Sequence, residues 1–304
     1  MKYKILVTGG TGFIGKNFIK FLLKKKIFQI YSLSTTKVRK DLREKNVNYI
    51  ACRLENEDLL KKKINYNFDY VVNFAGYIDH SNSKETFSSH YVGLKNLVKT
   101  IKYDKLKKFI QIGSSVEYGF SNSPQKETLK INISKLKSIY GKSKLKSTYF
   151  LIDQYRKKKL PIIILRPYLI FGPGQNDSRL IPFIIKNCLL NKSFDCSHGK
   201  QLRNFFYIKD FVSVVYKCLE IKVNGQIINV GSRKNYTVKF IIGKINQIIK
   251  KGSPEYGKLK LRKDEPKFLY PNLTKFKKLL NLKREVSIDI GLKQTIKYYR
   301  SKIK

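Results

Sequence analysis

Cysteine is scarce in this chain of 304 residues, which has only Cys52, Cys188, Cys196 and Cys218. None of the four is in a CxxC pair. Such sparse thiols are typical of a reducing compartment, so we expect a cytoplasmic protein. Cys188, Cys196 and His198 are near each other in sequence, but no tight ligand pair anchors them, and the spacing therefore predicts no metal site.

Long apolar runs are also missing. No stretch approaches the roughly 20 apolar residues that a membrane-spanning helix needs, so we expect no membrane span. The first predicted strand begins within the first four residues, which leaves no room before it for a signal peptide, so we expect none. The hydrophobic content of 42% nevertheless suits a globular chain with a large core, arranged as one large or two small domains.

Acidic residues are few: 21 stand against 64 basic ones, for a formal net charge of +43. So basic a surface attracts polyanions. Most of the basic residues, however, are lysines scattered along the chain, whereas nucleic-acid readers favour arginine for bidentate contacts. An AT-rich genome also enriches lysine codons. We therefore expect no specific nucleic-acid partner, and the cause of the charge stays open.

Glycine is concentrated where it is informative. A short apolar run ends at Thr8, and Gly9, Gly12 and Gly15 follow at three-residue spacing before an apolar-faced helical stretch. Strand, glycine turn and helix form the arrangement that binds a dinucleotide pyrophosphate, because the backbone can approach the phosphates and the helix N-terminus presents free N–H groups. The predicted cofactor contacts here are Gly9, Thr11, Gly12, Phe13, Ile14 and Gly15.

Two later segments indicate the chemistry. Ser114 and Ser115 follow an apolar run that reads as a buried strand, and Tyr140 and Lys144 are four residues apart in a helical stretch, so they share one helix face. A phenol with a pKa of about 10 is a poor base at neutral pH, but a nearby ammonium lowers that pKa. With a serine hydroxyl to align phenol and substrate, the set forms a proton-transfer device beside a hydride carrier.

Strand-like and helical stretches alternate along the first half of the chain. This alternation predicts an α/β fold with a doubly wound, Rossmann-type parallel sheet. The expected strands are Lys4–Thr8, Gln29–Leu33, Tyr49–Cys52, Tyr70–Phe74, Phe109–Gly113 and Ile162–Pro167, and the expected helices are Ile14–Lys25, Leu59–Ile64, Thr86–Ile101, Lys137–Lys158 and, further on, Ile181–Leu190.

In this order the motifs resemble the extended short-chain dehydrogenase/reductases, in the branch of nucleotide-sugar epimerases, reductases and dehydratases. The resemblance covers nearly the whole chain, and its matching segments are Thr8–Gly15, Val71–Gly76, Ser114–Tyr118, Tyr140–Lys144, Leu165–Gly174, Gly199–Asp210, Asn229–Gly231 and the stretch around Arg262. It implies transient oxidation or reduction of a sugar carbon, usually C4, with an NAD or NADP cofactor and a nucleotide-diphosphate sugar as substrate.

The resemblance also implies roles for single residues. Tyr140 is expected to be the acid/base, Ser114 its hydrogen-bonding partner and Lys144 the group that holds the nicotinamide ribose. Cofactor contacts are further expected from Ser34, Ala75, Gly76, Tyr140 and Lys144, and substrate contacts from Ser115, Arg203 and Arg262.

The resemblance divides the chain and suggests an assembly. Residues 1–170 would form the NAD(P)-binding Rossmann domain, and residues 171–304 a smaller substrate-binding lobe whose chain returns to the large lobe near 208–230. A homodimer is expected, formed by a four-helix bundle of residues 86–101 and 137–158 from each subunit.

Departures from the family pattern narrow the reaction. The 4,6-dehydratases place Asp-Glu directly after the catalytic Ser/Thr, where this chain has Ser115 and Val116, with Glu117 out of register. Leu169 stands where epimerases of the galactose type often have Asn. The first departure argues against a dehydratase. The second, together with Ser34 at the cofactor end, favours a 4-keto-sugar reductase or an epimerase of another substrate subclass.

Further departures concern the cofactor end. Ser34 stands where NAD users usually carry an acid for the ribose 2′-hydroxyl, which slightly favours NADP. Arg53 replaces an acid often found near the adenine, and His90 replaces the usual Asn.

The alternative to an enzyme is a cofactor-bound scaffold that works through its basic surface. The intact set of Ser114, Tyr140 and Lys144 favours the enzyme.

Overall fold

The computed structural model describes residues 2–77, 79, 81–261, 265–280, 282 and 284–303. The chain divides into two compact units. The first comprises Met1–Gly119, Glu127–Pro167 and Val212–Asn229, and the second comprises Phe120–Lys126, Tyr168–Phe211 and Val230–Lys304. The second unit thus includes a short segment, Phe120–Lys126, that lies well before the boundary expected at residue 170.

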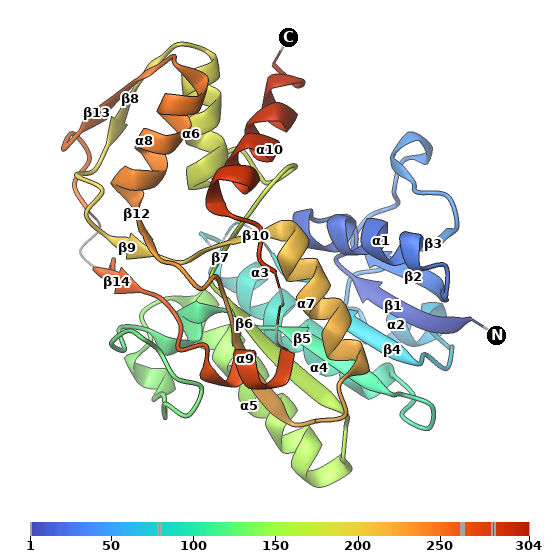
Figure 1. Ribbon diagram of the computed structural model, residues 1–304. Helices are drawn as coiled ribbons and strands as arrows, with labels where there is room; N and C mark the ends of the chain where they lie inside the picture. The colour runs from blue at the N-terminus through green and yellow to red at the C-terminus, as the bar shows by residue number, and fades with distance from the viewer. Residues whose placement is uncertain are drawn as a thin grey trace. The chain divides into compact units, whose positions relative to one another are not determined.

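The first unit is built on a seven-stranded sheet in the order β11-β6-β5-β4-β1-β2-β3 (Figure 1). β1 lies between β2 and β4 and pairs with both in parallel, so the strand order reverses there. Such a switch point is where doubly wound sheets bind their ligands. The Rossmann-type sheet is therefore confirmed. Its strands are β1 (Tyr3–Thr8), β2 (Phe28–Ser34), β3 (Val47–Ala51), β4 (Tyr70–Asn73), β5 (Lys108–Ile112), β6 (Ile162–Pro167) and β11 (Gln226–Val230).

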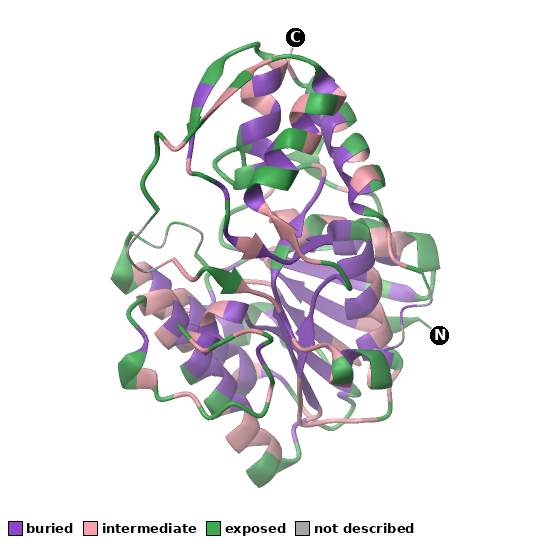
Figure 2. Cartoon of the chain, turned by 60° about the vertical axis from the view of Figure 1, so that its left-hand side comes forward, coloured by how far each residue is buried: buried purple, intermediate pink, exposed green. Residues whose placement is uncertain are grey.

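Helices cover both faces of this sheet, and its strands are largely buried (Figure 2). On one face, Leu60, Leu97 and Leu151 pack with strand residues in a single apolar core. On the other, the Phe21 and Tyr216 rings lie 5.4 Å apart. This double cover explains why the strands read as continuous apolar runs. The helices are α1 (Phe13–Lys25), α2 (Glu57–Lys63), α4 (Gly93–Thr100), α5 (Ile139–Lys158) and α7 (Ile208–Glu220).

The segment predicted as one helix over residues 86–101 has a more irregular form. It begins as α3 (Ser83–Phe87), passes through a π-helical turn, η2 (Ser88–Val92), and continues as α4. The Asn82 side chain caps α3 by accepting a hydrogen bond from the Glu85 N–H at 3.0 Å. Apolar periodicity predicts a helix here but does not reveal the π turn, because the turn shifts the register by a single residue.

The second unit combines short strands with a group of helices. In it β10 pairs with β7, β9 with β12 and β14, and β8 with β13. Its strands are β7 (Leu169–Phe171), β8 (Ser193–Cys196), β9 (Leu202–Arg203), β10 (Phe205–Tyr207), β12 (Tyr236–Thr237), β13 (Ser253–Tyr256) and β14 (Phe268–Leu269), and its helices are α6 (Leu180–Leu189), α8 (Val238–Ile249), α9 (Thr274–Leu280) and α10 (Ile288–Arg300). Within the described residues, no helix is long and apolar enough to cross a membrane.

Candidate active site

The glycine-rich loop joins β1 to α1. Gly9 has a positive φ of 66°, its N–H donates to the Leu33 carbonyl at 2.8 Å, and the Gly12 N–H donates to the Gly9 carbonyl at 3.0 Å. Gly12 is the N-cap of α1, and no side chain caps this helix end. The first N–H groups of α1 thus lack side-chain acceptors, as an anion-binding helix N-terminus requires.

The glycines of this loop differ in how closely the surrounding backbone packs against them. A Cβ on Gly9 would lie 2.9 Å from the Ala75 nitrogen, and one on Gly15 would lie 2.3 Å from the Gly9 carbonyl oxygen. The fold itself therefore demands both. A Cβ on Gly12 would meet only the Gly9 carbonyl oxygen, at 3.3 Å. Gly12 leaves open backbone at the helix end, which fits the close approach of a pyrophosphate.

A pocket adjoins this loop, lined by Gly10, Thr11, Lys16, Ile19, Val38, Leu42, Glu44 and Tyr49. Phe13 and Ile14 begin α1 as half-buried residues. Ser34 ends β2 as a buried residue, and its Oγ donates to the Thr36 carbonyl at 2.9 Å. The second strand therefore ends on a hydroxyl, not a carboxylate.

A buried polar chain runs across the carboxyl ends of β1, β4 and β5. Thr8 Oγ1 donates to Asn73 Oδ1, which also accepts from the Ala75 N–H at 3.1 Å. Asn73 Nδ2 in turn donates to Gln111 Oε1 at 2.8 Å. These bonds fix the loop that carries Ala75 beside the glycine loop, so residues from separate motifs meet at one edge of the sheet.

Tyr140 and Lys144 lie on α5, which begins after Ser138, whose Oγ accepts from the Gly141 N–H at 3.0 Å. Lys144 is buried, and its Nζ donates to the Ile112 carbonyl at 2.7 Å and lies 5.9 Å from the centre of the Tyr140 ring. Burial lowers the pKa of Lys144 to about 8. An ammonium thus sits close to the phenol ring, as their spacing in the sequence predicts.

Ser114 follows β5 and caps the short 3-10 helix η3 (Ser115–Tyr118). Glu117 completes a capping box, because its Oε1 accepts from the Ser114 N–H at 2.8 Å. Gly141 packs closely on this turn, since a Cβ there would lie 3.2 Å from the Val116 carbonyl oxygen. The structure therefore brings the turn of Ser114 and the buried Ser115 against the start of α5, near Tyr140.

Glu117, which is out of register with the acids of the 4,6-dehydratases, has a structural role that the sequence did not reveal. Its Oε2 accepts from Arg166 Nη2 at 2.7 Å and from Thr148 Oγ1 at 2.7 Å, and both ionic side chains are almost fully buried. Burial disfavours the charge on Arg166, but Glu117 outweighs this and the pKa of Arg166 is raised. The Ser-x-x-Glu spacing at 114–117 was the available signal of the capping box. The Arg166 partner had no local signal.

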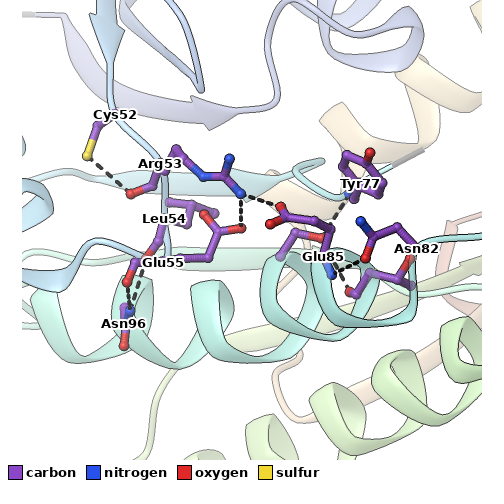
Figure 3. Close-up of polar contacts among 10 residues, drawn as sticks. Cys52, Arg53, Leu54, Glu55, Tyr77, Asn82, Glu85 and Asn96 are labelled. Carbon is purple, nitrogen blue, oxygen red and sulfur yellow. Dashed lines mark hydrogen bonds and ion pairs between the residues drawn. The ribbon is translucent and has the colours of Figure 1, made fainter. Parts of the chain in front are cut away.

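Arg53 follows β3 and contacts two carboxylates (Figure 3). Its Nη2 pairs with Glu85 at the start of α3 and lies 3.6 Å from a carboxylate oxygen of Glu55. The Arg53 side chain is half exposed. Arg53, which stands where the family often has an acid, is thus paired with two acids. Its ion pair with Glu85 connects the segment after β3 to α3.

Of the two arginines expected to contact substrate, the structure describes only Arg203. Arg203, in β9 of the second unit, is buried, and it donates to Glu265 at 2.6 Å and to the Leu202 carbonyl at 2.9 Å. It is therefore already ion-paired. Arg262 lies outside the described residues. Within them, no group of three His, Cys, Asp or Glu residues is placed to hold a metal ion.

The fold and this site together define a Rossmann-type protein that has a glycine-rich loop after β1 and a tyrosine–lysine pair on α5. The profile of the NAD dependent epimerase/dehydratase family matches residues 5–231. The chain belongs to that enzyme family.

Relatives agree with this assignment. The chain is 28% identical to a UDP-N-acetyl-alpha-D-glucosaminuronate decarboxylase of Bacillus cytotoxicus, over 99% of this chain and 98% of that protein. It is 32% identical to a dTDP-D-glucose 4,6-dehydratase of Dictyostelium discoideum, over 75% of this chain and 58% of that protein. A UDP-glucuronic acid 4-epimerase from Bacillus cereus, solved with UDP-glucuronic acid and NAD, superposes with a TM-score of 0.86 at 26% identity, covering 98% of this chain and 99% of that one.

Proposed function

We propose that this chain is an NAD(P)-dependent enzyme that acts on a nucleotide sugar by proton and hydride transfer at a sugar carbon. The observation that carries the proposal is the placement of Tyr140 and a buried Lys144 beside the Ser114 turn, at the sheet edge that holds the glycine loop. The family membership and the nucleotide-sugar substrates named for its relatives support it.

The protein's own groups would move the proton. Tyr140 exchanges a proton with a sugar hydroxyl or keto oxygen, and the Ser114 hydroxyl shares that hydrogen bond. Lys144 favours the phenolate through its charge and holds the cofactor ribose. The bound nicotinamide supplies hydride acceptance or donation. The backbone of Gly12 and the N-terminus of α1 hold the pyrophosphate.

Within this chemistry we favour an epimerase or a 4-keto-sugar reductase over a dehydratase. Water elimination in the 4,6-dehydratases uses an Asp-Glu pair that is replaced here by Ser115 and Val116. Glu117, two residues after Ser115, is buried, and its two carboxylate oxygens accept hydrogen bonds from Arg166 and from the Ser114 N–H. Analysis of the product distinguishes an epimerase from a 4-keto-sugar reductase.

For the substrate diphosphate we propose Arg203 and Arg262 as guanidinium donors, since a planar fork suits phosphate oxygens. Arg203 would have to exchange its ion pair with Glu265 for the phosphate. Ser115 is proposed to contact the sugar. For the cofactor we propose NAD or NADP, with NADP slightly favoured because β2 ends on Ser34.

The deciding experiment starts with mass spectrometry of small molecules that co-purify with the protein. Steady-state assays on nucleotide sugars and 4-keto sugars follow, each with NADH and NADPH, and with NAD⁺ for epimerisation. We expect a bound dinucleotide and turnover of at least one nucleotide sugar. A bound dinucleotide without turnover of any sugar would instead support the scaffold alternative.

A further inference from the structure

His90 lies in the π-helical turn η2 and is buried, with 6% of its surface exposed. A π turn within an α-helix displaces side chains from the ordinary helical register, and such turns occur frequently at functional positions. In this chain the turn presents an imidazole where the resembled family usually has Asn.

The imidazole contacts the candidate catalytic tyrosine. Its ring centre lies 5.1 Å from that of Tyr140, with the planes at 59°. Nε2 lies 3.3 Å from the Tyr77 carbonyl oxygen. Because a carbonyl only accepts, Nε2 carries the hydrogen of this bond.

The backbone around the imidazole is fixed as well. Ser147 Oγ on α5 donates to the His90 carbonyl at 2.8 Å, and the Tyr77 N–H donates to Ser89 Oγ at 3.0 Å. The turn η2 therefore binds Tyr77 on both sides of its backbone, and α5 binds η2. The His90 ring occupies the junction of these contacts, next to Tyr140.

Gly76 explains how the ring fits. A Cβ at this position would lie 1.9 Å from Cε1 and 2.4 Å from Nδ1 of His90. Gly76 is not among the glycines with a positive φ, so its backbone conformation does not require glycine. It is the imidazole that excludes a side chain there. Gly76 and His90 form a matched pair between the loop after β4 and the turn η2.

We propose that His90 is a positioning residue for Tyr140, a role that rests on the proposed function above. Seated on Gly76 and bonded to the Tyr77 carbonyl, the imidazole holds the Tyr140 ring from the side of the loop after β4. Lys144 Nζ lies 5.9 Å from the centre of the same ring. Fixing the ring keeps the phenol oxygen at its reacting position, and a displacement of about 1 Å in such a group can cost up to about 10²-fold in rate.

The kinetic test compares H90A with the wild type. We expect kcat to fall about ten- to a hundredfold, while KM and the dissociation constant of the dinucleotide stay within about twofold. Free imidazole, which has the ring that H90A removes, should restore part of kcat in H90A but not in H90A/Y140F. The matched control is H198A, because His198 is exposed and in the second unit, and it should leave kcat unchanged.

A double-mutant cycle tests the contact itself. G76A alone should displace the imidazole and lower the melting temperature, whereas G76A in the H90A background should lower the melting temperature little further than H90A alone. If H90A does not fold, H90N and H90N/G76A replace it in the cycle. Unchanged kcat in the folded His90 variants, or strictly additive losses, would overturn the proposal. Should the wild type turn over no nucleotide sugar, the proposed function fails, and the melting-temperature cycle still tests the Gly76–His90 pair.

Discussion

At the scale of single residues, Tyr140 and Lys144 are expected to have different roles. The phenol of Tyr140 transfers the proton, and the ammonium of Lys144 both favours the phenolate and binds the dinucleotide. Y140F should lower kcat about 10²–10⁴-fold, because that is the usual contribution of general acid/base catalysis, and should leave dinucleotide binding nearly intact. K144A should reduce both turnover and dinucleotide affinity, since the side chain serves both partners. Steady-state kinetics and calorimetric titration measure the two effects. A Y140F enzyme with wild-type turnover would refute the assignment.

Gly12 provides a second residue-scale test, because an added Cβ there would meet only the Gly9 carbonyl oxygen, at 3.3 Å, and we expect the pyrophosphate to approach its backbone closely. G12V should fold yet lose dinucleotide binding, since a side chain at the N-cap of α1 blocks the pyrophosphate. G15A should instead lose stability, because its Cβ collides with the Gly9 carbonyl oxygen. Calorimetry and thermal unfolding separate these outcomes.

The control for G12V and G15A is G243A in α8, where an added Cβ meets nothing within 4 Å. Replacing a mid-helix glycine there should raise stability by up to about 1 kcal/mol and leave binding unchanged. Dinucleotide affinity that stays at the wild-type level in folded G12V would contradict the assigned role of the loop.

At the scale of elements, the buried pair of Glu117 and Arg166 joins η3 to β6. E117Q leaves the Arg166 charge buried without its partner, which typically costs about 3–5 kcal/mol of unfolding free energy. It also weakens the bond that orients the Ser114 backbone. Replacing both residues together, as E117L/R166M, should cost less than E117Q. Urea unfolding of the three proteins tests this ordering, and equal stability of E117Q and the wild type would exclude a structural role for the pair.

Asp210 in the first turn of α7 should make stability depend on pH. Burial raises the pKa of its carboxyl to about 6, against the opposing hydrogen bond from the Val286 N–H and with a further contribution from Glu285. The folded state thus holds this proton more tightly than the unfolded state, whose pKa is about 3.9. The unfolding free energy contributed by this group therefore falls as pH rises from about 4 to 6, by about 3 kcal/mol, and then levels off.

D210N removes this dependence, because an amide stays neutral and still accepts from the Val286 N–H. The difference in unfolding free energy between D210N and the wild type should grow from pH 4 to pH 6 and favour D210N at neutral pH. D104N, at an exposed aspartate in a turn, is the control and should show a constant difference. A difference for D210N that does not change with pH would show that the carboxyl titrates normally.

At the scale of the whole molecule, the expected homodimer would use α3, η2, α4 and α5. Their surface carries a half-buried aromatic group: Tyr91 lies 5.3 Å from Phe87 and 6.4 Å from Phe150, ring centre to ring centre. Lys146 Nζ lies 5.2 Å from the centre of the Phe87 ring. A two-fold axis would set these side chains against their own copies.

We expect light scattering to show a dimer whose fraction increases with salt concentration. The net charge of +43 opposes association of two subunits, and salt screens this repulsion. Y91D should shift the mass toward the monomer. I290D, at a half-exposed position on α10, should not. A monomeric wild type at both low and high salt would refute this arrangement.

Sequence alone determined the sheet, the glycine loop and the Tyr140–Lys144 pair, since each depends on local spacing: alternating apolar runs, glycines three apart and two residues four apart on a helix. Strand and helix limits agree with the prediction to within a few residues. The π turn was missed because it alters the helical register without altering its composition.

Only the tertiary structure determined the long-range contacts that fix the sheet, the glycine loop and the Tyr140–Lys144 pair in place. The bond from Lys144 to the Ile112 carbonyl, the pair of Glu117 and Arg166 and the seat of His90 on Gly76 each join residues that are distant in sequence. Apolar periodicity does not specify such partners. The first two form because parallel strands bring their carboxyl ends to one edge of the sheet, where polar groups cut off from water must bond to one another. The third is a steric fit between a loop and a helical turn that only the folded chain brings together.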